Sequence, residues 1–171
     1  MNKNLVLTGM MGVGKTTVGK SLAEKLSFRF IDIDKLIEEK EGCSINLIFK
    51  NKSESYFRRL EKIISLKELK RDASVISLGG GAFLDKSIRR SVKNSAISFW
   101  LDLNVNELTK RLSKSKKRPL LFNRNLGETV NKIYLERKRT YSEADFRIKC
   151  HFLKSDEIVK KILKIYEKST N

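Results

Sequence analysis

Proline, glycine and cysteine are scarce in this sequence, and long apolar runs are missing. One proline and nine glycines in 171 residues exclude a collagen-like chain and a chain made mostly of flexible linkers. No apolar segment approaches the roughly 20 residues that a membrane-spanning helix needs. The two cysteines, Cys43 and Cys150, lie far apart, and neither they nor the single histidine, His151, fit a metal-binding or redox spacing. We therefore expect inert thiols, a structural histidine, and a reduced, cytoplasmic protein without a signal peptide or a membrane span.

Acidic residues are in the minority as well. The 37 Lys and Arg residues outnumber the 20 Asp and Glu residues, so the formal net charge is +17. Such an excess is typical of nucleic-acid-binding proteins, of Lys-rich solvated surfaces and of sites for anionic small molecules. The basic residues are spread along the whole chain, and no aromatic signature of RNA-binding strands accompanies them. We therefore expect no specific nucleic-acid partner, and the length fits a single domain over residues 1–171.

Short apolar segments alternate with segments of helical periodicity along the whole sequence. Five segments are expected to be strands: 4–8, 28–33, 74–78, 96–101 and 146–150. Helices are expected over 16–26, 34–40, 44–70 with a break near 51–53, 85–92, 104–112, 127–141 and 155–167. This alternation predicts an α/β fold, a five-stranded parallel sheet with helices on both faces. A ligand would then bind at the carboxyl ends of the strands.

The most specific motif directly follows the first expected strand. Residues 9–16 read Gly-Met-Met-Gly-Val-Gly-Lys-Thr and match the phosphate-binding pattern G-x-x-x-x-G-K-[ST] at every position. In such a loop the glycines let main-chain N–H groups surround phosphates, and the following helix adds the positive end of its dipole. Lys15 would reach the β- and γ-phosphates of ATP, and the Thr16 hydroxyl would bind Mg²⁺. The motif predicts a nucleotide site of the P-loop NTPase type and leaves the phosphate acceptor open.

Charged residues and glycines that could bind an acceptor lie near other strands. Asp32 and Asp34 stand two residues apart at the expected end of the second strand, where both side chains would leave on one face. Such a pair could hold Mg²⁺ through water and accept a proton from a hydroxyl, although Asp at a strand end is also a common helix cap. Arg58 and Glu61 fit one helical face, either as a surface ion pair or as an arginine fork for a carboxylate. Gly79–Gly81 follow the third strand, where bare main chain can approach a ligand closely.

Residues 113–125 form a basic and polar segment between two expected helices. It holds five basic residues and the only proline of the chain, within Arg118-Pro119-Leu120-Leu121. Because closely spaced like charges repel one another, we expect this segment to be a mobile lid that closes over the phosphates when ATP binds.

Together these motifs resemble those of the shikimate kinase family, in the nucleoside-monophosphate-kinase-like branch of P-loop proteins. The matching segments occur in the family's order over about residues 4–165: residues 9–19, Phe30-Ile-Asp-Ile-Asp34, Phe57-Arg58-x-x-Glu61, Leu78-Gly-Gly-Gly81, Arg118-Pro-Leu-Leu121 and Arg137-x-x-x-Tyr141. The resemblance implies ATP-dependent phosphorylation of the 3-hydroxyl of shikimate, giving shikimate 3-phosphate and ADP, a step of chorismate and aromatic amino-acid biosynthesis. It implies ATP as co-substrate, Mg²⁺, and a monomer that binds small molecules rather than a membrane.

The resemblance also implies roles for individual residues. Asp34 would bind the shikimate hydroxyls and act as the base, and Lys15 and Arg118 would complete the catalytic group. The ATP-binding residues would be Gly12, Val13, Gly14, Lys15, Thr16, Thr17, Arg111 and Arg118, with Arg111 stacking on adenine. The shikimate-binding residues, partly in a helical segment over about 34–61, would be Asp34, Phe57, Arg58, Glu61, Gly79, Gly80, Gly81 and Arg137. Thr16 and Asp32 would hold Mg²⁺, the latter through water.

The sequence departs from the family pattern in places, and two other functions remain as alternatives. Ser53 stands where the family usually has Gly, before an expected helix. No Pro follows Arg137, so either Arg137 or Arg139 could face the substrate, and the spacing to Tyr141 favours Arg137. A gluconate kinase would share the phosphate-binding loop but has no reason to carry Arg58, Arg137 and the triple glycine together. A nucleic-acid-binding or scaffold protein of this fold would be expected to lose Asp34 or Arg58.

Overall fold

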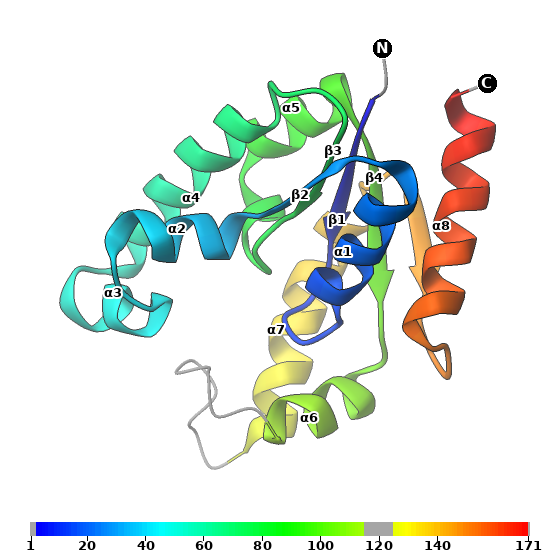
Figure 1. The fold of residues 1–171 in the computed structure, drawn as a ribbon. Coiled ribbons are helices and arrows are strands. Elements are labelled where there is room, and N and C mark those ends of the chain that lie inside the picture. The colour runs from blue at the N-terminus through cyan, green and yellow to red at the C-terminus, as the bar shows by residue number, and fades with distance from the viewer. Residues whose placement is uncertain (1–2, 115–124, 171) are drawn as a thin grey trace.

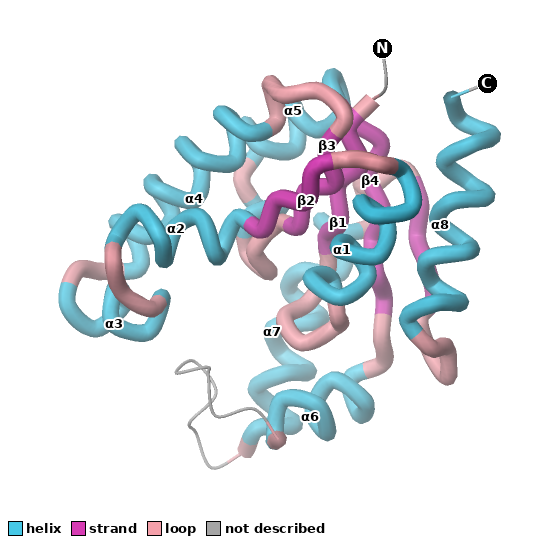
Figure 2. The backbone as a smooth tube through the Cα atoms, in the orientation of Figure 1, coloured by secondary structure: helices cyan, strands magenta, loops and turns pink. Residues whose placement is uncertain are grey.

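A computed structural model of the protein describes residues 3–114 and 125–170, and within these residues it has one five-stranded parallel sheet. The strand order is β2-β3-β1-β4-β5. The strands are β1 (Asn4–Thr8), β2 (Arg29–Asp32), β3 (Ser74–Ser77), β4 (Ala96–Asp102) and β5 (Phe146–Lys149). Figure 2 shows the strands at the centre with the helices around them. The predicted α/β fold with a parallel sheet is confirmed.

Helices cover both faces of the sheet, as the alternation predicts. On one face α1 (Lys15–Leu26) packs against α8 (Ser155–Thr170), and on the other lie α4 (Glu54–Glu68), α5 (Lys86–Ser95) and the 3₁₀ turn η1 (Ala82–Leu84). Two short helices, α2 (Ile33–Glu41) and α3 (Ile45–Asn51), project away from the sheet beside α4 (Figure 1). Helices α6 (Val105–Ser113) and α7 (Leu126–Tyr141) pack together near the end of β4. Both described ends of the chain lie at the opposite end of the sheet.

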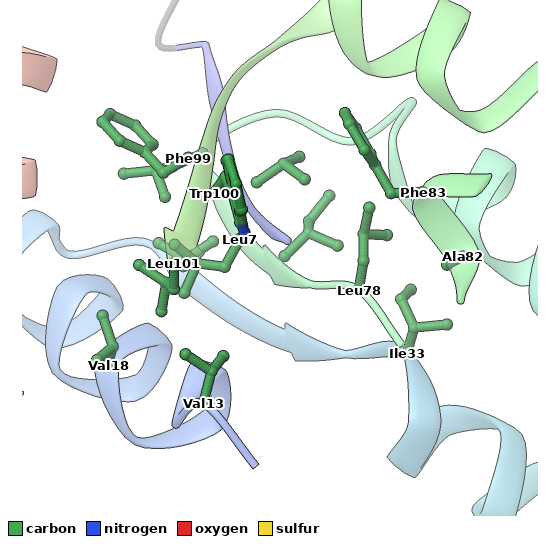
Figure 3. Close-up of a cluster of buried hydrophobic side chains, with 14 of the residues drawn as sticks. Leu7, Val13, Val18, Ile33, Leu78, Ala82, Phe83, Phe99, Trp100 and Leu101 are labelled. Atoms are coloured by element: carbon green, nitrogen blue, oxygen red, sulfur yellow. The ribbon is translucent and has the colours of Figure 1, made fainter. Parts of the chain in front are cut away.

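The three inner strands form the core of the molecule. Every residue of β1, β3 and β4 is buried, whereas the edge strands β2 and β5 are partly exposed. Figure 3 shows Phe99, Trp100 and Leu101 of β4 within one cluster that also contains Val18 of α1 and Phe83 of η1. Strand β1 pairs with β3 on one side and with β4 on the other. The chain leaves β1 toward β2 on the first side, and it leaves β3 toward β4 on the second side, so the two connections run in opposite directions across the sheet and diverge at the carboxyl end of β1. A ligand crevice is expected at such a point.

The beginning of α2 differs from the sequence-based expectation. Strand β2 ends at Asp32, whose side chain caps α2 by accepting a hydrogen bond from Lys35 N at 3.4 Å. The prediction that Asp32 and Asp34 share one face of a strand is therefore wrong, because Asp34 lies in the first turn of the helix. The predicted break in the helical stretch after residue 44 is confirmed, and Ser53 caps α4 by accepting from Tyr56 N at 3.1 Å.

Cys150 and His151 have the structural environments expected of them. Cys150 is buried, and burial raises the pKa of its thiol to about 11, so it stays protonated. His151 Nδ1 accepts a hydrogen bond from Asn104 N at 3.1 Å, which joins the chain after β5 to the start of α6. The described residues contain no cluster of three or more His, Cys, Asp or Glu side chains that could hold a metal. No helix among them is long and apolar enough to cross a membrane.

Candidate active site

The predicted phosphate-binding loop connects β1 to α1 at the carboxyl edge of the sheet. Gly9, Gly12 and Gly14 have φ angles of 135°, 78° and 102°, a region that residues with a side chain rarely adopt. A Cβ atom at Gly9 would also overlap the carbonyl oxygen of Leu101 at the end of β4. The loop therefore needs its glycines both for its backbone angles and for its close packing on β4.

Lys15 and Thr16 begin the helix that follows this loop. The buried Lys15 ammonium donates hydrogen bonds to the carbonyl oxygens of Gly9 (2.9 Å) and Met10 (3.0 Å), which hold it inside the curve of the loop. The Thr16 hydroxyl donates to Asp32 Oδ2 at 2.8 Å. A hydroxyl and a carboxylate are hard oxygen ligands of the kind that Mg²⁺ binds, together with phosphate oxygens and water. The two side chains therefore fit a Mg²⁺ ion bound mainly through a nucleotide.

The other predicted nucleotide residues lie around the loop. Val13 is buried, and its carbonyl oxygen accepts a hydrogen bond from Arg111 Nη1 at 3.2 Å, which places the Arg111 guanidinium against the loop. Thr17 is exposed on the first turn of α1. Arg118 and residues 115–124 of the predicted lid lie outside the described residues.

A cavity of about 840 Å³ joins the phosphate-binding loop to helices α2, α3 and α4. It is lined by most of the predicted acceptor residues, which come from separate parts of the chain: Asp34, Phe57, Arg58, Glu61, Gly80, Gly81 and Arg137. Of the two alternative arginines, the favoured Arg137 lines this cavity, whereas Arg139 is exposed and does not line it. Lys15, Thr16 and Asp32 line the same cavity. An acceptor here would therefore lie next to the phosphates of a bound nucleotide.

Glu61 orients Arg58 from within the protein interior. Arg58 Nη1 donates to Glu61 Oε2 at 2.7 Å, and the Glu61 side chain is only 3% exposed, so the pair is not the surface ion pair considered above. Burial raises the pKa of Glu61 to about 7 against the opposing effect of Arg58, and the charge of Asp34 adds to the rise. Glu61 Oε1 makes no hydrogen bond with any described residue. This carboxyl group therefore changes its charge near neutral pH.

The glycines after β3 lie against charged side chains. A Cβ atom at Gly79 would come within 2.6 Å of Asp34 Oδ1 and closer still to Glu61 Oε1. A Cβ atom at Gly81 would overlap the Arg58 guanidinium, whose Cζ lies 2.7 Å away. The turn therefore has no room for side chains, because two carboxylates and one guanidinium occupy the space beside it.

Helix α7 fixes the main chain of Gly80. Arg137 Nη1 donates to the Gly80 carbonyl oxygen at 2.9 Å, and the Tyr141 hydroxyl donates to the same oxygen. Tyr141 is fully buried, and burial raises the pKa of its phenol, which keeps the donor protonated. Tyr141 belongs to a motif quoted above, but nothing in the sequence assigned it this role. Two guanidinium groups, Arg58 and Arg137, thus face a cavity that also contains Asp34, an arrangement suited to a small carboxylate that carries hydroxyl groups.

Comparison with protein families and curated proteins points to one group. A family model described as "Shikimate kinase" matches residues 11–167. A shikimate kinase of Sulfurihydrogenibium sp. is 42% identical over 161 residues, which cover 94% of this chain and 96% of the relative. A shikimate kinase of Thermodesulfovibrio yellowstonii is 37% identical and covers 99% of this chain and 98% of the relative.

Solved structures give the same result at the level of the fold. A shikimate kinase from Acinetobacter baumannii in complex with shikimate superposes with a TM-score of 0.94 and 32% identity, covering 99% of this chain and 95% of the other. A gluconokinase from Sinorhizobium meliloti has a TM-score of 0.57 and 16% identity, covering 97% and 92% of the two chains. That second likeness extends to the fold alone.

Proposed function

The chain belongs to the shikimate kinase family, and from this premise we propose how its residues transfer the γ-phosphoryl group of ATP to the 3-hydroxyl of shikimate. The products are shikimate 3-phosphate and ADP, in a step of chorismate and aromatic amino-acid biosynthesis. The observation that carries the proposal is the cavity that links the phosphate-binding loop to Arg58, Arg137 and Asp34. It offers adjoining environments for a triphosphate and for a hydroxylated carboxylate.

On the acceptor side, the two arginines bind the shikimate carboxylate. Their planar donor groups match a carboxylate, and each is already oriented, Arg58 by Glu61 and Arg137 by the Gly80 carbonyl. Asp34 binds the ring hydroxyls and takes the proton of the attacking 3-hydroxyl. Of the remaining acceptor residues, Phe57, Glu61, Gly80 and Gly81 line the cavity, and Gly79 lies against Asp34 and Glu61.

On the nucleotide side, the loop N–H groups and Lys15 bind the phosphates of ATP. Mg²⁺ would be held by the Thr16 hydroxyl and, through water, by Asp32, and it would neutralise charge on the phosphate oxygens. Arg111, beside the loop, stacks on adenine, and Arg118 reaches the phosphates from the lid at 113–125. The roles of Arg118 and the lid rest on the sequence alone. Catalysis of this kind is mostly positioning and charge neutralisation.

The proposal extends to the domain organisation, oligomeric state, location and partners of the protein. All described strands belong to one sheet, which supports one catalytic domain over residues 1–171 with an acceptor-binding helical segment at about 34–61. We propose that this domain acts as a monomer in the cytoplasm, on small molecules, with neither a specific nucleic acid nor a membrane as partner.

An acceptor panel tests the proposal. ADP release is measured with shikimate, quinate, gluconate and nucleoside monophosphates, each with and without Mg²⁺. We expect release that depends on both shikimate and Mg²⁺ and that far exceeds the rate with gluconate or any nucleoside monophosphate. Equal rates with gluconate and shikimate would contradict the assignment.

A further inference from the structure

A second cavity, of about 520 Å³, lies between α5 and the chain that joins α7 to β5. Its charged lining residues are Lys86, Arg89, Arg90, Lys93, Glu143 and Asp145. None of them belongs to the active site described above. Four basic and two acidic residues give the lining a net charge of +2.

The basic residues of this cavity share one face of α5. They stand at positions 86, 89, 90 and 93, a spacing that brings side chains together on a helix. Lys86, Arg90 and Lys93 are exposed and form no ion pair with a described carboxylate. Like charges at this spacing destabilise a helix, so the arrangement costs stability unless an anion binds there.

The two acidic residues are already occupied by other partners. Asp145 accepts hydrogen bonds from Ser98 N at 2.8 Å and from the Ser98 hydroxyl at 2.6 Å, at the start of β4. Glu143 Oε2 accepts from Arg89 Nε at 3.0 Å. Neither carboxylate therefore neutralises the three exposed cations.

Arg89 is held in place before any ligand arrives. Its Nη1 donates to the carbonyl oxygens of Phe83 (2.8 Å) and Leu84 (2.9 Å), while Nε donates to Glu143, and the side chain is 17% exposed. Its Nη2 makes no hydrogen bond with a described residue. A guanidinium fixed by three hydrogen bonds loses little further side-chain freedom when an anion binds to its remaining donor.

The same contacts connect the cavity to the acceptor site. Phe83 and Leu84 belong to η1, which directly follows the glycine turn, and Glu143 lies two residues beyond Tyr141 of α7. Gly80, in that turn, accepts its two hydrogen bonds from α7. Arg89 thus links η1, which follows the glycine turn, to the residues that follow α7, the helix that binds the Gly80 carbonyl.

We propose that this second cavity binds a phosphate group, either of a small phosphate ester or of inorganic phosphate, and that its occupancy changes the affinity for the acceptor. A phosphate carries a charge of about −1.5 to −2 at pH 7 and three acceptor oxygens, which match the net charge of +2 and the converging donors. A concave site that also contains two carboxylates favours a compact anion over an extended polyanion. The binding claim stands apart from the proposed function, whereas the effect on the acceptor rests on it.

Calorimetric titration tests the binding claim at constant ionic strength, with ADP, Mg²⁺ and shikimate filling the active site. The probes are inorganic phosphate and glucose 6-phosphate, which distinguish the free ion from an ester. We expect one saturable site, and roughly tenfold weaker binding in the variant Arg90→Ala/Lys93→Ala, which loses two charge-assisted contacts. The matched control Lys160→Ala/Lys164→Ala removes the same charge from the exposed face of α8 and should bind the probe as the wild type does.

Each other outcome overturns the claim. Equal weakening in both double variants would mean diffuse attraction to a basic surface, and the absence of saturable binding of either probe would mean that the cavity is no phosphate site. The effect on the acceptor is read from the probe's Kd with and without shikimate, which should differ at least twofold, with the same factor in the shikimate Kd. An unchanged Kd refutes the coupling. If shikimate itself fails to bind, the proposed function fails, while the probe titrations on the two double variants still decide the binding claim.

Discussion

The nucleotide half and the acceptor half of the active site are built in different ways. The phosphate-binding core of the nucleotide half is one short segment, residues 9–17, whose buried lysine is held by carbonyl oxygens of the same loop. The acceptor half combines side chains from α2, α4 and α7 with a glycine turn after β3. The first can form once β1 and α1 are in place, whereas the second requires four separate elements to pack correctly. We therefore expect the two halves to respond independently to substitution.

The halves also differ in their electrostatics. Around the loop, the Lys15 ammonium and the main-chain N–H groups provide a positive environment that suits the anionic phosphates. In the acceptor half, Asp34 and the buried Glu61 lie beside Arg58 and Arg137, and the Glu61 carboxyl has a pKa raised to about 7 by burial. The charge of this carboxyl, and with it the stability of the acceptor half, therefore depends on pH near neutrality.

The largest effect is expected from Asp34→Asn, which removes the base of the acceptor half. An amide cannot take the hydroxyl proton, so kcat should fall by roughly 10²-fold or more, while the Kd for ADP stays unchanged. Asp156→Asn, an exposed change at the start of α8, is the matched control for kcat. If the Asp34 variant keeps a near-normal kcat, the residue does not act as the base.

A smaller effect is expected from Gly79→Ala. The added methyl group would push against the carboxylates of Asp34 and Glu61, and such overpacking typically costs about 1–3 kcal/mol. We expect kcat/KM for shikimate to fall by about 10- to 100-fold, with little change in the KM for ATP. Gly127→Ala is the control, since its Cβ would make only an ordinary contact with Thr109 at 3.9 Å. Equal effects of the two substitutions would contradict the tight packing of the glycine turn.

The pH dependence of stability isolates Glu61. Its pKa is about 7 in the folded protein against an ordinary value of 4.5, so between these pH values the folded state binds more protons than the unfolded chain. The free energy of unfolding should therefore fall as pH rises from about 4.5 to 7, on the order of 1–3 kcal/mol, and no further above that range. Urea unfolding of the wild type and Glu61→Gln at several pH values measures this, because Gln does not titrate. Parallel pH profiles would show that Glu61 is not the source.

The smallest effect is expected from Tyr141→Phe. This variant loses one hydrogen bond to the Gly80 carbonyl while Arg137 keeps the other, a loss of about 1 kcal/mol. The KM for shikimate should rise about fivefold, and the KM for ATP should not change. A similar rise in both KM values would mean that Tyr141 supports the whole fold rather than the acceptor half.

The same difference between the halves explains what could be predicted from the sequence. The nucleotide loop is contiguous, and its glycines and lysine act through local backbone geometry, so the motif alone located it. The three glycines from Gly79 predicted a close approach, but not that the approaching groups are Asp34, Glu61 and Arg58. Those partners depend on tertiary packing, which no local pattern records.

Helix rotation, helix capping and burial account for the remaining differences between the sequence-based expectations and the structure. The spacing to Tyr141 favoured Arg137 over Arg139 but could not decide between them, because the rotation of α7 is set by its contacts with η1 and α6. The side chains of Asp32 and Asp34 were expected to leave the strand end on one face, but Asp32 accepts a hydrogen bond from Lys35 N, so helix α2 begins before Asp34. The basic face of α5 was visible only as part of the net charge until its cavity was known.

Separate titrations of shikimate and ADP test the independence of the two halves most directly. Each ligand is titrated alone into the wild type, Arg137→Ala and Lys15→Ala. We expect Arg137→Ala to weaken shikimate binding by about tenfold or more and to leave the ADP Kd within about twofold, since a hydrogen bond to a charged group contributes about 1.5–3 kcal/mol. Lys15→Ala should weaken ADP binding by about tenfold or more and leave the shikimate Kd within about twofold. If either variant weakens both ligands to the same extent, the two halves are not built independently and the account is wrong.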